Sequence, residues 1–210
     1  MSVYVYAIAR GAPEPPNTAG LAGARVEMLA ADRLAAAYSW LEGREVDASA
    51  DALWAHEAVV DELMRTTTVL PLRFGTMVDG TAALEALLTD RHAHFVALLD
   101  RVAGCVELAV RVAVQDAPDS QGGDGRDYLA AKLSARRAAD AVLVPLAAAA
   151  AAVRRTPARG GGVAASYLVA REGVGEFAEE VRALRESHPE LDLSCTGPWA
   201  PYSFVAEEVR

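Results

Sequence analysis

The residues that could support metal chemistry are few and poorly spaced for it. The histidines are His56, His92, His94 and His188. Only His92 and His94 are close in sequence, and an i, i+2 spacing points their rings to different sides of a helix. A zinc protease needs two histidines one helical turn apart. We therefore expect no metal site.

Nucleophilic and phosphate chemistry also lack a motif. Neither Cys105 nor Cys195 lies beside a histidine in a known arrangement, and no G-x-S-x-G run occurs. Both cysteines lie in apolar runs, which favours reduced core residues over a disulfide. The glycine-rich runs 122–125 and 160–162 lack the lysine and hydroxyl residue of a phosphate loop. We expect no catalytic residue and no bound cofactor.

The charge argues against nucleic acid and anionic membranes as main partners. The formal net charge is −9, and Lys132 is the only lysine, whereas phosphate contacts need clustered cations. The N-terminus lacks the basic region of a signal peptide. The alanine-rich run 143–153 is shorter than the roughly 20 apolar residues of a membrane span. We expect a cytoplasmic protein.

The hydrophobic pattern indicates the elements that must position any functional residue. With 52% hydrophobic residues, the chain can bury a core without metals or disulfides. Residues 24–41 fit either a helix or two strands that turn at Asp32-Arg33, and we favour the hairpin. In chain order we expect a strand at 3–8, this hairpin, a helix at 49–64, a strand from 66, a helix at 81–104, a strand at 105–114, a loop at 115–125, a helical segment at 126–155 kinked or split at Pro145, a strand at 163–171, a helix at 174–187, a strand at 191–195 and an irregular tail.

This order predicts an α+β or mixed α/β fold, and we favour α+β. The alternation of strands and helices after residue 105 is typical of ferredoxin-like sheets. The first strand should lie inside a sheet, since both of its faces are apolar.

One unusual segment is TTTVLPLRFGTMV, residues 66–78. Pro71 lacks an amide donor, which suits an edge position or a strand end. The strand period directs Arg73 away from the side of Phe74, so its guanidinium needs a carboxylate, a carbonyl, water or a partner protein. Gly75 can turn the chain towards the next helix.

The second unusual segment is LDLSCTGPWAPYSFV, residues 191–205. Its prolines favour an extended path, and Trp199, Tyr202 and Phe204 supply large apolar surfaces. The tail could pack against its own domain as a latch or expose an aromatic docking site. The sequence leaves both interpretations open.

These two segments, together with YVYAI at 4–8 and HEAVVDELM at 56–64, resemble the gas vesicle protein F/L family over essentially the whole chain. Ala200 stands where we expect a second proline in the terminal motif. The resemblance implies two small domains, which we place at residues 1–80 and 81–210. The second would be a modified ferredoxin-like fold with extra helices that includes the aromatic tail.

The resemblance also implies a function. We expect a non-enzymatic accessory protein of gas vesicles, the structures that give cells buoyancy. It would act in assembly by binding the hydrophobic major shell protein or other accessory proteins, and could remain as a minor vesicle component. A ferredoxin-like small-molecule-binding protein or enzyme is one alternative, and a structural homo-oligomer whose sheet edges pair is a second. The residues assigned to partner contact or to structural support are Arg73, Phe74, Gly75, Trp199, Tyr202 and Phe204.

Overall fold

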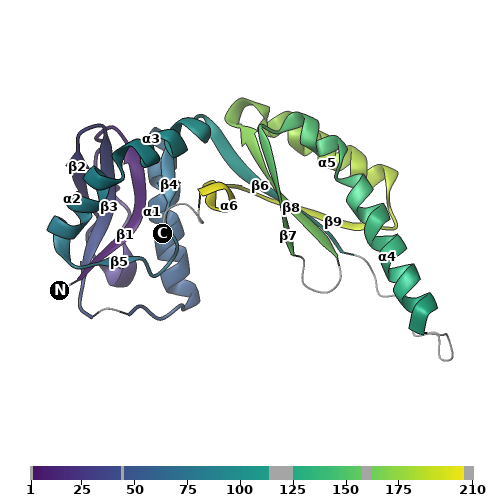
Figure 1. Cartoon of the computed structure of the whole chain (residues 1–210), viewed down its shortest axis with the longest axis horizontal. Coiled ribbons are helices and arrows are strands. Elements are labelled where there is room, and N and C mark those ends of the chain that lie inside the picture. Colours follow the sequence, from purple (N-terminus) through teal and green to yellow (C-terminus); the bar gives the residue numbers. More distant parts are fainter. Residues whose placement is uncertain (1, 44, 114–124, 158–161, 206–210) are drawn as a thin grey trace. The chain divides into compact units, whose positions relative to one another are not determined.

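The computed structural model describes residues 2–43, 45–113, 125–157 and 162–205 (Figure 1). Packing divides the chain into two units. The first is Met1–Gly104 with Ala200–Arg210, and the second is Cys105–Trp199. Both units combine helices with an antiparallel sheet, which confirms the α+β prediction.

The first unit is built on a sheet of five strands among its described residues. Strand order is β2-β3-β1-β4, and β5 also pairs with β1. The strands are β1 (Ser2–Arg10), β2 (Glu27–Ala31), β3 (Leu34–Leu41), β4 (Val69–Pro71) and β5 (Met77–Val78). Strand β1 lies inside the sheet and its residues from Val3 to Ala9 are fully buried, as its two apolar faces predicted. The hairpin interpretation of 24–41 is also confirmed, because β2 and β3 pair across a turn at Asp32, whose φ is +52°.

Helices cover both faces of this sheet (Figure 1). They are α1 (Ala50–Thr66), α2 (Gly80–Asp90) and α3 (His92–Arg101), with a short 3-10 helix η1 (Leu21–Gly23) and a terminal turn α6 (Tyr202–Val205). Ser49 caps α1 by accepting a hydrogen bond from the Ala52 amide at 3.2 Å. The inward residues of α1 follow helical spacing: Val59, Val60, Leu63 and Met64 are buried.

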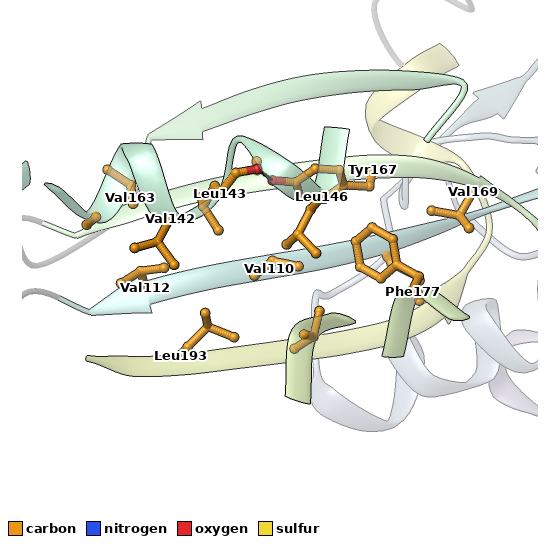
Figure 2. Packing of buried hydrophobic residues seen from close by; sticks show 14 residues of the cluster. Val110, Val112, Val142, Leu143, Leu146, Val163, Tyr167, Val169, Phe177 and Leu193 are labelled. Atoms are coloured by element: carbon orange, nitrogen blue, oxygen red, sulfur yellow. Dashed lines mark hydrogen bonds between the residues drawn. The ribbon is translucent and has the colours of Figure 1, made fainter. Parts of the chain in front are cut away.

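The second unit is ferredoxin-like. Its sheet has the order β7-β8-β6-β9, and its elements follow a βαββαβ sequence. They are β6 (Cys105–Ala113), α4 (Gly125–Val142), β7 (Ala152–Pro157), β8 (Val163–Ala170), α5 (Val174–Ser187) and β9 (Asp192–Trp199), with 3-10 helices η2 (Pro145–Ala149) and η4 (Arg171–Gly173). The helical segments pack their apolar side chains against one face of this sheet (Figure 2).

The core of the second unit centres on an aromatic pair. Tyr167 of β8 and Phe177 of α5 are buried with ring centroids 5.2 Å apart. Figure 2 shows them among Val110, Leu146 and Val169. The Tyr167 hydroxyl donates to the Leu143 carbonyl at 3.0 Å, so the one polar atom of this pair is satisfied.

Two helix predictions were wrong in extent. The segment 81–104 forms two helices that meet at Arg91, where φ and ψ are −106° and 16°. Apolar spacing could not reveal this break, because buried residues on both sides keep the same helical phase. The segment 126–155 ends as a helix at Val142, and β7 occupies 152–157. Pairing with β8 overrides the helix propensity of the alanine-rich run.

Two terminal predictions also differ from the structure. Strand β9 continues past 195 to Trp199 and pairs only with β6, so it lies at the sheet edge. Residues 202–205 form one helical turn within the segment expected to be irregular. The expected loop at 115–125 falls almost entirely outside the described residues.

The packing boundary differs from the expected division at residue 80. Helices α2 and α3 pack on β1 and its neighbouring strands, which buries Leu84, Leu88 and Phe95 within the first unit. The tail from Ala200 also belongs to the first unit. Helices α2 and α3 directly precede β6 in the sequence but cover the other sheet. The sheet that a helix covers is the one against which it buries its apolar side chains.

Phe177→Ala should lower the free energy of unfolding by about 3–5 kcal/mol, because it removes a buried ring and leaves a cavity beside Tyr167. Denaturant unfolding followed by circular dichroism measures the loss. Val144→Ala is the matched control, since Val144 is 60% exposed and should change stability by less than about 0.5 kcal/mol. A loss below about 1 kcal/mol for Phe177→Ala would contradict this description of the core.

Candidate functional site

The first predicted motif forms the turn between β4 and β5. Pairing with β1 continues past Pro71 for one more bond, from the Leu72 amide to the Tyr6 carbonyl at 2.9 Å. The Thr76 amide and hydroxyl then donate to the Arg73 carbonyl at 3.1 and 2.7 Å. Gly75 has a φ of +86°, a conformation that favours glycine. Pro71 thus lies at the end of an edge strand, as predicted.

A buried chain of hydrogen bonds links this turn to the C-terminal tail. The Gly75 amide donates to the Tyr4 hydroxyl at 3.1 Å. Tyr4 Oη lies 2.8 Å from His56 Nδ1, and His56 Nε2 lies 3.1 Å from Tyr202 Oη. The Tyr202 hydroxyl is also hydrogen-bonded to Glu57. We call Tyr4, His56, Tyr202 and Glu57 the relay.

Each hydrogen bond of the relay needs one donor and one acceptor, and this requirement decides where the protons lie. We assign the Tyr4 hydroxyl proton to His56 Nδ1, because in this direction the hydroxyl both accepts from Gly75 and donates, so that its proton has a partner. His56 is then neutral and carries its proton on Nε2, which donates to Tyr202. Tyr202 in turn donates to Glu57, because an ionised carboxylate can only accept.

Burial sets the electrostatics of the relay. His56 is 1% exposed, and burial lowers its pKa to about 4, an effect that the Leu72 backbone offsets only in part. Burial also raises the pKa of Tyr4 and of Tyr202, and the Glu57 carboxylate raises that of Tyr202 further. Near neutral pH the histidine is therefore uncharged, and both hydroxyls keep their protons.

Aromatic rings enclose the relay. Phe74 packs edge-on against Tyr4 and His56, with centroid distances of 6.1 and 5.9 Å. Tyr6 packs 4.9 Å from Tyr4, and its hydroxyl accepts from the Leu21 amide and donates to Ser39. The phenylalanine of the first motif thus shields the relay, and Tyr6 extends the polar core towards η1.

The tail packs into the first unit as a latch. Phe204 is buried, and its carbonyl accepts a hydrogen bond from the Arg101 guanidinium. Ala200 and Pro201 are buried as well, so the absent second proline leaves the tail well packed. Between these residues, Tyr202 places its hydroxyl on His56.

Two of the six predicted residues keep exposed side chains. The Arg73 side chain is exposed, and the part of Arg73 that holds the turn is its backbone carbonyl, which accepts from Thr76. Trp199 is 40% exposed and ends β9 in the second unit. Its indole N–H lies 3.4 Å from the Thr196 hydroxyl, and the preceding Gly197-Pro198 bond is cis.

The structure thus brings Phe74, Gly75, Tyr202 and Phe204 into one unit, while Trp199 belongs to the other. Sequence reasoning missed Tyr4, His56 and Glu57 as parts of this site. One signal was present for His56: it precedes Val59, Val60 and Leu63 by three, four and seven positions, which places it on the apolar face of its helix.

The described residues offer little for other chemistry. They contain no group of three or more histidine, cysteine, aspartate or glutamate side chains arranged to hold a metal ion. Burial raises the pKa of the Cys105 and Cys195 thiols, so both favour the unreactive protonated form. None of the described helices has the length and hydropathy to span a membrane. The relay itself is a structural network in which each polar group has a partner.

These features define a class of two-unit α+β proteins in which a ferredoxin-like unit precedes a tail that belongs to the first unit. The chain belongs to the family described as gas vesicle synthesis protein GvpL/GvpF, whose model matches residues 2–206. It therefore has a gas vesicle-related role.

Named relatives and solved structures agree with this membership. Gas vesicle protein L of Streptomyces sp. (strain CB03234) is 36% identical, over 78% of this chain and 73% of the relative. Gas vesicle protein F of the same strain is 32% identical, over 98% and 100%. The crystal structure of GvpF from Anabaena sp. PCC7120 superposes with a TM-score of 0.84 at 24% identity, over 97% of this chain and 95% of the other. That structural likeness supports the fold.

The relay predicts a pH dependence of stability. His56 has a pKa of about 4 in the folded chain and near 6.5 when unfolded, so between these values the unfolded state binds the extra proton. The free energy of unfolding should keep its full His56 contribution above pH 6.5. It should fall by on the order of 3 kcal/mol as the pH drops to about 4. Denaturant unfolding across this range measures it. His56→Gln should flatten this part of the profile, and an unchanged profile in this variant would refute the assignment.

Tyr202→Phe should lower the free energy of unfolding by about 1–3 kcal/mol, because it removes the partner of both His56 Nε2 and Glu57. Thermal and denaturant unfolding measure the loss. Tyr38→Phe is the control, because the Tyr38 hydroxyl donates to Glu27, whose side chain is half-buried. This substitution should lower the free energy of unfolding by no more than about 1 kcal/mol. Equal losses for the two variants would argue against a special role of the relay.

Proposed function

We propose that this protein is a non-enzymatic accessory factor of gas vesicle assembly that binds the hydrophobic major shell protein. The observation that carries the proposal is the match of nearly the whole chain, residues 2–206, to a family named for gas vesicle synthesis.

The physical properties of the chain suit such a role. A shell protein that polymerises through apolar surfaces is prone to aggregate before assembly. A soluble partner with a net charge of −9 keeps a complex in solution through mutual repulsion. It needs only limited apolar contact surface of its own.

We assign the contact within the two motifs to Arg73 and Trp199, whose side chains are exposed. Arginine and tryptophan are the residue types most enriched among residues that dominate binding energy. Phe74, Tyr202 and Phe204 would support the motifs from inside, since Phe74 and Tyr202 surround His56 and Phe204 is buried.

Co-expression with the major gas vesicle shell protein tests this proposal. We expect the wild-type chain to raise the amount of soluble shell protein after centrifugation and to be captured with it. Trp199→Ala and Arg73→Ala should fold normally and reduce capture severalfold or more. Val144→Ala and Arg136→Ala are controls, because both change exposed side chains outside the motifs.

Two outcomes would count against it. If the wild-type chain neither solubilises nor captures the shell protein, direct shell binding fails, and other accessory proteins become the partners to test. If the wild-type chain succeeds but folded Trp199→Ala and Arg73→Ala variants perform equally well, the residue assignment fails and the motifs are structural.

A further inference from the structure

The outward face of α1 carries the most exposed tryptophan side chain among the described residues. Trp54 is 65% exposed and its neighbour Leu53 is 43% exposed. Both lie on a 17-residue helix whose opposite face is buried against β1 and β4. A large aromatic side chain left in water on a rigid helix is a typical anchor for a partner protein.

Small residues frame this side chain. Ala50 and Ala58 are exposed one helical turn before and after Trp54. The tryptophan therefore stands as a ridge between two shallow positions, where the side chains of a second helix can seat. The backbone of α1 is already hydrogen-bonded within the helix, so strand addition is excluded here. This shape favours a helical partner.

The surrounding charge is predominantly negative. Residues 44–65 contain two arginines, Arg44 and Arg65, which lie at the two ends of this stretch. The six carboxylates between them are Glu45, Asp47, Asp51, Glu57, Asp61 and Glu62. The Glu62 carboxylate accepts hydrogen bonds from Asn17 and Thr18. The Glu57 carboxylate accepts one from Tyr202. Asp51 is exposed beside Trp54, and Asp61 stays 47% exposed although Arg65 pairs with it at 2.5 Å.

We infer that this outward face binds a basic amphipathic helix of a partner protein. We name the surface the Trp54 face. It consists of Ala50, Asp51, Leu53, Trp54, Ala58 and Asp61. The apolar stripe of the partner helix would cover Trp54 and Leu53, and its lysine or arginine side chains would lie beside Asp51 and Asp61. The charge selects the partner and the tryptophan supplies most of the affinity.

Synthetic peptides test the inference with the full chain. The probe is a labelled peptide of about 18 residues, five helical turns, with leucine along one face and lysine elsewhere. One comparison peptide replaces lysine by glutamate, and another scrambles the basic sequence so that no apolar face remains. Fluorescence anisotropy measures binding. We expect the basic amphipathic peptide to bind at least about tenfold more tightly than either comparison peptide.

Variants of the chain locate the site. Trp54→Ala should weaken binding by roughly thirtyfold. Asp51→Lys should weaken binding and reduce its salt dependence between about 0.05 and 0.5 M salt. Val144→Ala and Glu186→Lys alter an exposed apolar and an exposed acidic residue in the other unit, and both should bind like wild type.

Three results would overturn the inference: no saturable binding of the basic amphipathic peptide, equal binding of a comparison peptide, or unchanged binding by both folded Trp54→Ala and Asp51→Lys. The inference does not rest on the proposed shell-protein contact. The assay contains only this chain and synthetic peptides, so either proposal can fail while the other stands.

Discussion

A histidine without contact to water must stay neutral, and this requirement organises the first unit. His56 lies on α1 between a tyrosine from the central strand and a tyrosine from the tail. An unpaired nitrogen there would cost the full penalty of burying a polar group. The relay avoids that cost only if the Gly75 turn, strand β1, helix α1 and residue 202 all hold their places. One polar side chain thereby couples segments up to 146 residues apart in sequence.

Sequence pattern predicted much of this architecture because much of it is set by local burial. In β6 the alternating Leu108, Val110 and Val112 line the core, and the helical spacing in α1 and α5 corresponds to one buried face on each helix. Where the secondary structure of a segment depends on pairing with a distant part of the chain, the hydrophobic pattern was insufficient to predict it. Residues 152–157 became a strand because β8 was available to pair with them. The break at Arg91 left the apolar phase unchanged, so no periodicity could indicate it.

The candidate site shows the same limit. The two unusual segments were recognisable, and Gly75 adopts the turn expected of it. That Phe74 and Tyr202 would meet around His56 was not predictable, because the pairing of Tyr4 with both His56 and Gly75 depends on the finished sheet. The result separates two roles within the motifs: buried residues stabilise the unit, and exposed ones remain available to a partner.

The protonation state of His56 tests this account most directly. Nitrogen NMR of the imidazole at neutral pH distinguishes the two neutral tautomers and the charged ring. The hydrogen-bond order from the Gly75 amide to Glu57 predicts a neutral ring protonated on Nε2, with Nδ1 accepting from Tyr4. A ring protonated on Nδ1, or a charged imidazolium, would contradict the relay and the coupling between the turn and the tail.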